Sequence, residues 1–66
     1  KILNVINPEH ILIQRLQIFS MDGQLLNTYK VNTDDNILLP MGHSEKQLIV
    51  KIDGENLTHS FVVIFN

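Results

Sequence analysis

Apolar residues along this chain gather in six short segments that are separated by Gly, Pro, Asn and Asp. None of the segments is long enough to be a typical helix of ten or more residues, and several alternate polar and apolar positions, which is typical of β-strands. The pattern therefore predicts strands over residues 2–6, 11–19, 25–31, 37–39, 46–53 and 57–65.

Two of these segments predict one buried face and one solvent-exposed face. Positions 15–18 read Arg-Leu-Gln-Ile, and 46–53 alternates in the same way around a more apolar centre. Side chains two residues apart share a face of a strand, so the apolar members of each series should point into one core. The residues expected inside are Leu16, Ile18, Leu48, Val50 and Ile52.

Three glycines mark the expected changes of direction. The pair Asp22-Gly23 lies between two apolar segments and supplies the positive φ that tight hairpins need, so Gly23 is expected at φ > 0. The run Asp53-Gly54-Glu55-Asn56 is expected to form a second hairpin turn between the last two strands. Gly42, directly after a Pro-Met pair, is expected to turn a corner.

These signals predict a single all-β domain over residues 1–66. Short strands at regular spacing, joined by turn residues, favour a sandwich or a barrel over a βαβ fold. We expect an immunoglobulin-like antiparallel β-sandwich of about six to seven short strands. The chain starts at Lys1 without Met and enters an apolar segment at once. We therefore expect the chain to be an excised or processed piece that lacks the first strand of the domain.

Composition agrees with a small packed core and argues against several classes of function. Hydrophobic residues make up 44% of the chain and cysteine is absent, so neither disulfides nor a thiolate zinc site can stabilise the fold. The net charge is −2 and the five basic residues stand singly, which argues against nucleic-acid binding. The longest apolar run, 61–65, is far shorter than the ~20 residues of a membrane-spanning helix, so no transmembrane segment is expected.

Candidate metal ligands are scattered along the sequence. His10, His43 and His59 each stand alone, without the spacing that lets neighbouring side chains share a metal. We expect His10 and His43 in loops and His59 on the solvent face of the last strand. The 32–36 segment, which contains Asp34-Asp35, lacks the positioned Gly and the closing Glu of a calcium loop, so it is expected to be a polar loop. The sequence predicts no metal site and no cofactor.

No catalytic arrangement is visible in the sequence. Ser20 and Ser60 lack a neighbouring base and a Gly-x-Ser-x-Gly frame, so we predict that the chain is not an enzyme and has no catalytic residues. The Asn-Leu-Thr at 56–58 matches the N-glycosylation pattern, but a hairpin edge is the expected role. Glycan-binding modules stack sugars on exposed aromatic rings, and this chain has no Trp and one Tyr, Tyr29, in an apolar strand.

From residue 2 onward the sequence resembles the C-terminal sorting domains of the type IX secretion system in Bacteroidetes. Residues 16–26 resemble the hairpin V-x-V-Y-D-x-x-G-R-x-V of that family, with Phe19 at the aromatic position and Gly23 at the glycine. Residues 37–42 resemble its I-D-L-S-x-L-x-x-G stretch, and 48–52 resemble its Y-x-V-K-V strand. The resemblance implies a compact β-sandwich that serves as an export address and needs no catalytic residue. It also implies that residues 1–66 are the C-terminal part of a longer secreted protein.

This resemblance also implies a partner and a location. The domain would be recognised by the outer-membrane secretion machinery and exported through the periplasm to the cell surface or the medium. Small secreted sandwich proteins of gut Bacteroides share the same hairpin and the same glycine-then-strand pattern. They keep open an alternative, a free-standing secreted or lipid-anchored immunoglobulin-like sandwich that binds a protein or a glycan at the cell surface.

Overall fold

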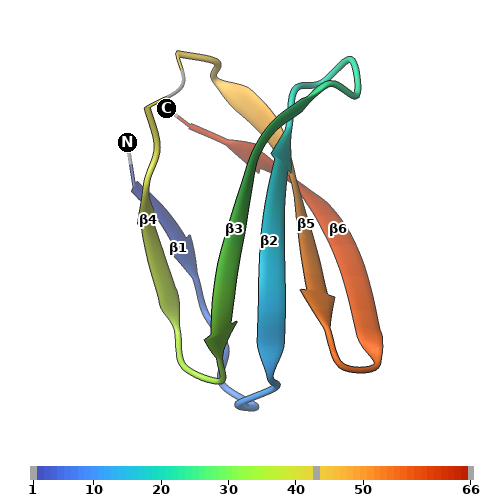
Figure 1. Cartoon of the computed structure of the whole chain (residues 1–66). Coiled ribbons are helices and arrows are strands. Elements are labelled where there is room, and N and C mark those ends of the chain that lie inside the picture. The colour runs from blue at the N-terminus through green and yellow to red at the C-terminus, as the bar shows by residue number, and fades with distance from the viewer. Residues whose placement is uncertain (1, 43, 66) are drawn as a thin grey trace.

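The computed structural model describes residues 2–42 and 44–65, which form strands, turns and loops (Figure 1). The predicted all-β class is confirmed. These residues include no helix that is long and apolar enough to cross a membrane. The strands are β1 (Ile2–Val5), β2 (Ile13–Phe19), β3 (Leu25–Thr33), β4 (Ile37–Pro40), β5 (Gln47–Gly54) and β6 (Leu57–Ile64).

The strands form two antiparallel sheets, as the predicted β-sandwich requires. One sheet pairs β1 with β4, and the other has the order β3-β2-β5-β6 (Figure 1). With β1 and β4 as strands B and E, and β3, β2, β5 and β6 as C′, C, F and G, this is the strand order of an immunoglobulin-like sandwich. Within the described residues β4 is the one neighbour of β1, so no strand occupies the A position beside it.

The core lies between the two sheets and is almost entirely aliphatic. The series predicted to point inward from β2 and β5 is confirmed, since all five of its residues are buried. Each such large apolar side chain contributes about 1.5–3 kcal/mol when it leaves water. The buried cluster consists of Leu3, Val5, Ile13, Leu16, Ile18, Ile37, Met41, Leu48, Val50 and Ile52.

The start of β2 and the end of β3 differ from the predicted bounds. The second apolar segment was predicted from residue 11, but β2 begins at Ile13 because residues 6–12 cross from one sheet to the other. β3 continues to Thr33, beyond its predicted end, because Thr33 still pairs with Ile13 of β2. A polar end weakens the sequence signal of a strand without preventing its backbone pairing.

The β2–β3 turn is held by backbone geometry and by one side chain. Gly23 has φ 91°, so the positive φ predicted for this turn is confirmed. A left-handed backbone conformation costs L-amino acids about 1–2 kcal/mol. Its N–H donates to the Ser20 carbonyl at 3.0 Å, and the Gln24 N–H donates to the Ser20 hydroxyl at 3.1 Å. Asp22 lies in the same turn.

The hairpin predicted between β5 and β6 is confirmed, but Asp53 and Gly54, which were expected in its turn, both belong to β5. The turn itself consists of residues 55–56. Gly54 has no left-handed φ, but a Cβ at this position would lie 2.5 Å from the carbonyl oxygen of Leu12. The close approach of the loop before β2, and not the turn, therefore requires glycine here.

Gly42 follows β4 in the loop that leads to β5, where it was expected to turn a corner. It has no left-handed φ, and a Cβ on it would meet no atom within 4 Å. The preceding Met41 is 6% exposed and belongs to the core, so this side chain anchors the start of the loop. His43 lies outside the described residues.

Alanine substitution should lower the stability of the domain at Gly54 but not at Gly42. Gly54→Ala forces a Cβ against a backbone oxygen and should cost about 1–3 kcal/mol of unfolding free energy, as overpacking does. Gly42→Ala enters open space and should stay within about 0.5 kcal/mol of the parent chain. Urea unfolding of both variants measures the difference, and equal stabilities would contradict the close approach at Leu12.

Candidate functional site

The outer face of the four-stranded sheet carries a β-bulge that decides which side chains reach solvent. Between β2 and β5, Ile13 pairs with Gly54 and Arg15 pairs with Asp53, so Gln14 is an extra residue in β2. Gln14 and Arg15 are both exposed, while Ile13 stays in the core. The bulge thus brings two consecutive polar side chains to the surface.

β3 has a matching irregularity on the other side of β2. Two residues of β3, 31 and 32, lie opposite the one residue Gln14 of β2. Asn32 has φ 45°, a left-handed conformation that Asn adopts more readily than most residues. Both strands are therefore distorted at the same level of the sheet.

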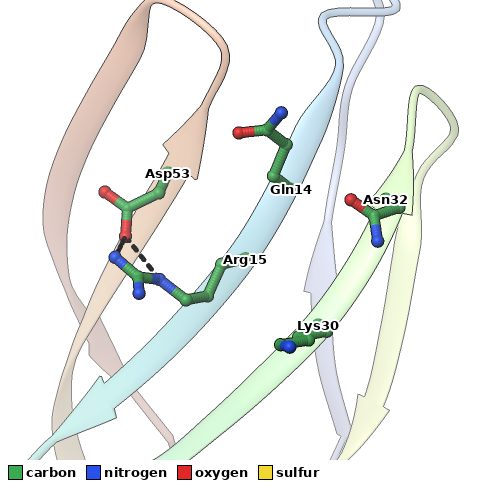
Figure 2. A pocket seen from close by; sticks show the side chains of 5 residues that line it. All are labelled: Gln14, Arg15, Lys30, Asn32 and Asp53. Carbon is green, nitrogen blue, oxygen red and sulfur yellow. Dashed lines mark hydrogen bonds and ion pairs between the residues drawn. The ribbon is translucent and has the colours of Figure 1, made fainter.

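Five polar side chains line an open hollow of about 460 Å³ at this bulge: Gln14, Arg15, Lys30, Asn32 and Asp53 (Figure 2). Arg15 reaches from β2 to β5, where its Nε and Nη2 donate to Asp53 Oδ2 at 3.0 and 2.8 Å. The Arg15 hydrogen bonds lower the pKa of Asp53 below its ordinary value of 3.8, and partial burial opposes them less strongly. A hydrogen bond from Thr58 lowers it further.

The hollow offers one uncommitted cation and two amide groups. In the part of the chain that the structure describes, the one salt bridge joins Arg15 to Asp53, so Lys30 is not paired with a carboxylate. Lys30 lies directly opposite Arg15 in the β2–β3 register. The amides of Gln14 and Asn32 can both donate and accept. This set suits hydroxyl or carboxylate groups of a small polar ligand.

At the other end of the same face, apolar side chains form a line across all four strands. Leu25 pairs with Phe19, Phe19 with Ile49, and Ile49 with Val62. Leu25 and Val62 are 49% and 54% exposed, and Ile64, two residues beyond Val62, is 63% exposed. We call Leu25, Phe19, Ile49, Val62 and Ile64 the apolar stripe. Contiguous apolar surface of this kind is typical of interaction sites.

A row of polar residues borders the apolar stripe. Thr28 pairs with Gln17, Gln17 with Lys51, and Lys51 with Ser60, one position further along each strand of the outer face. Ser60 is thus an exposed strand residue opposite a lysine. An apolar centre with a polar border is the usual anatomy of a protein interface.

The outer face of the small sheet is also apolar. Ile2 and Leu38 are 66% and 67% exposed, and Ile6, just after β1, is 61% exposed. Ile2 pairs with Pro40, and Leu38 pairs with Asn4, whose polar side chain interrupts the apolar surface. This face is narrower than the apolar stripe because it has two strands.

The structure gives the positions of two side chains that were singled out in the sequence, His59 and Tyr29. His59 lies on the last strand and is exposed, as predicted, but it pairs with the buried Ile52 and therefore lies on the inward side of β6 and not on the outer face. β6 is an edge strand, and the two-stranded sheet leaves His59 uncovered, at an apolar hollow of about 260 Å³. Tyr29 packs against the core and accepts a hydrogen bond from Asn27 at 3.2 Å.

Ser20 has a structural role in the β2–β3 turn. Its hydroxyl donates to the carboxylate of Asp22, and this hydrogen bond lowers the pKa of Asp22 below its ordinary value of 3.8. The same oxygen accepts the Gln24 N–H. The hydroxyl is thus committed to the turn.

At the opposite end of the sandwich, a buried amide joins two loops. Asn7 is 7% exposed, and its Nδ2 donates to the carbonyls of Ile11 and Asp34 at 2.8 and 3.1 Å. Its Oδ1 accepts the Ile11 N–H at 3.2 Å, and its own N–H donates to Asn36 Oδ1 at 2.7 Å. These bonds connect the β1–β2 loop to the β3–β4 loop.

The same contact brings together residues that the sequence separates. His10 lies in the β1–β2 loop, as expected, and its Nδ1 is 3.1 Å from the carbonyl oxygen of Asp34. One ring nitrogen of His10 and one carboxylate oxygen from each of Asp34 and Asp35 lie within 4.8 Å of one another. Sequence spacing gave no sign of this cluster. The cluster could have been found only from the strand topology, because it forms where two loops meet at the same end of the sandwich.

No protein-family model, curated protein or solved structure matches this chain. The surfaces that remain for functional inference are the apolar stripe, the polar hollow at the bulge, and the loop cluster around His10.

Removal of the Arg15 guanidinium should change the titration of Asp53. A carboxyl whose pKa is lowered by folding stabilises the fold above its ordinary pKa of 3.8, and this contribution disappears as the pH falls through the lowered pKa. In Arg15→Ala the pKa of Asp53 should rise, and the fold should lose less stability in acid. Carboxyl NMR titration measures this, with Asp22 as the internal reference that should not move.

Replacement of Asn7 should destabilise the whole domain. Asn7→Ala leaves the Ile11 N–H and two loop carbonyls without their partner and should cost at least about 2 kcal/mol. The matched control is Asn4→Ala, an exposed asparagine of β1, which should change stability by less than about 0.5 kcal/mol. Chemical unfolding decides the point, and equal effects in the two variants would show that Asn7 does not hold the loops.

Proposed function

We propose that this domain is a non-catalytic recognition module, a secretion-sorting or cell-surface accessory domain that outer-membrane export machinery binds through the apolar stripe. The observation that supports this proposal is the cross-strand line of apolar residues on the outer face. Its side chains add to no core, since they point away from the small sheet. A solvent-exposed apolar line of this length is best explained by a protein partner.

The resemblance to sorting domains supports the same surface. Phe19 and Leu25, on either side of the β2–β3 turn, belong to the hairpin that carries the resemblance, and both lie in the apolar stripe. The partner would be the outer-membrane secretion machinery or another surface protein. The domain would pass through the periplasm and act at the cell surface or outside the cell.

A second candidate function is favoured by the polar hollow. A free-standing secreted or lipid-anchored sandwich could use Lys30, Asn32 and Gln14 to bind a glycan or an acidic group of a protein. Tyr29 offers no stacking surface for a sugar there, because it packs on the core side of β3. Hydrogen bonds and charge would have to supply the affinity of such a site.

An export assay in a type IX-competent host tests the first candidate. Residues 1–66 fused to the C-terminus of a periplasmic reporter should send the reporter to the cell surface. Val62→Asp places a charge in the apolar stripe and should leave most of the reporter in the periplasm. Leu38→Asp, at an exposed apolar position on the other sheet, is the matched control and should be exported normally.

The same assay can overturn the proposal. Melting curves of both variants establish that each still folds. If a known sorting domain exports the reporter while residues 1–66 leave it in the periplasm, the sorting role fails and the free-standing binding module becomes the better account. If Val62→Asp is exported as well as Leu38→Asp, the apolar stripe is not the recognised surface.

A further inference from the structure

The loop cluster at the end of the sandwich where Asn7 joins two loops contains three potential metal ligands from two segments of the chain. His10 comes from the β1–β2 loop, and Asp34 and Asp35 come from the β3–β4 loop. Their ligand atoms lie within 4.8 Å of one another. Coordination bonds of about 2.0–2.2 Å place two ligands of one tetrahedral ion about 3.5 Å apart, so small rotations of these exposed side chains bring their ligand atoms to a shared ion.

The backbone that carries these ligands is fixed by a buried group. The Asn7 carbonyl accepts the His10 N–H at 3.2 Å, and the Asn7 amide holds the Asp34 carbonyl at 3.1 Å. The Asp35 N–H donates to Thr33 Oγ1 at 3.2 Å. These bonds fix the loops that carry the three side chains, and the contact of His10 Nδ1 with the Asp34 carbonyl at 3.1 Å orients the imidazole as such contacts do at metal sites.

We propose that His10, Asp34 and Asp35 bind one divalent transition-metal ion, with Zn²⁺ as the best fit. An imidazole nitrogen combined with carboxylate oxygens is a donor set that Zn²⁺ accepts, and two carboxylates balance its charge. Calcium fits poorly, because it needs six to eight oxygen ligands and rarely takes imidazole. All three side chains are exposed, so water completes the coordination and the ion exchanges with solvent.

Metal binding at this place has a structural consequence. The ion links the two loops that Asn7 already joins, and both loops connect one sheet to the other. An ion that binds the folded chain and not the unfolded chain raises its stability. The site lies at the opposite end of the molecule from the β2–β3 turn and the adjoining apolar stripe (Figure 1). This inference is therefore independent of the proposed export role.

Titration of the 66-residue chain with ZnCl₂ tests the proposal. Calorimetry should show one ion per chain with a dissociation constant below about 1 mM, and saturating zinc should raise the melting temperature. Trace Mn²⁺, a paramagnetic probe for the same ligands, should broaden NMR signals of residues 7–11 and 33–36 first. CaCl₂ at the same concentrations should produce neither effect.

Two histidine variants separate the cluster from adventitious binding. His10→Asn removes the imidazole while keeping a residue that tolerates φ 53°, and it should weaken zinc binding at least about tenfold. His59→Ala removes an exposed imidazole elsewhere and should leave the affinity unchanged. The proposal is overturned if zinc does not saturate below about 1 mM, if His10→Asn binds like the parent chain, or if the manganese broadening centres on His59.

Discussion

The buried Asn7 holds together, by hydrogen bonds, the two loops that connect the sheets at one end of the molecule. The chain passes between the sheets twice at one end of the molecule, through residues 6–12 and 34–36, and Asn7 hydrogen-bonds to both segments. Both N–H groups and the oxygen of its side chain have partners, so its burial leaves no polar group unsatisfied. A domain of this size buries a smaller share of its surface than a large domain does, so one satisfied polar connection supplies a larger part of its stability.

The outer face of the large sheet is divided into two halves because the bulge interrupts the alternation of β2. At the bulge, Gln14 and Arg15 are both exposed, and polar groups gather around them. Beyond it β2 pairs regularly with β5, and a second irregularity in β3, at Leu26, brings Leu25 opposite Phe19. Phe19 and Ile49 thus fall into one line with their neighbours on β3 and β6. The two candidate binding surfaces of this domain are thus separated along a single sheet.

The sequence by itself determined the strands, the inward-facing residues and one turn. Alternation at Leu16 and Ile18 and at Leu48 and Val50 is a local property, because side chains two apart on any strand share a face whatever the strand pairs with. The left-handed φ of Gly23 is equally local, since its turn closes within five residues. The sandwich class followed from the number and spacing of such elements.

Only the tertiary structure decided which distant segments meet. Glycine is required at position 54 by the Leu12 carbonyl, which lies 42 residues earlier in the chain. In the sequence, the preceding Asp53 makes this glycine resemble a turn residue. The bulge at Gln14 is defined by the pairing of β2 with both β3 and β5, and no residue type within β2 predicts it. His10 reaches Asp34 because two loops leave the sheets at the same end and one buried amide holds them together. Pattern along a chain reports local geometry, whereas sites arise from contacts between segments that the pattern treats as unrelated.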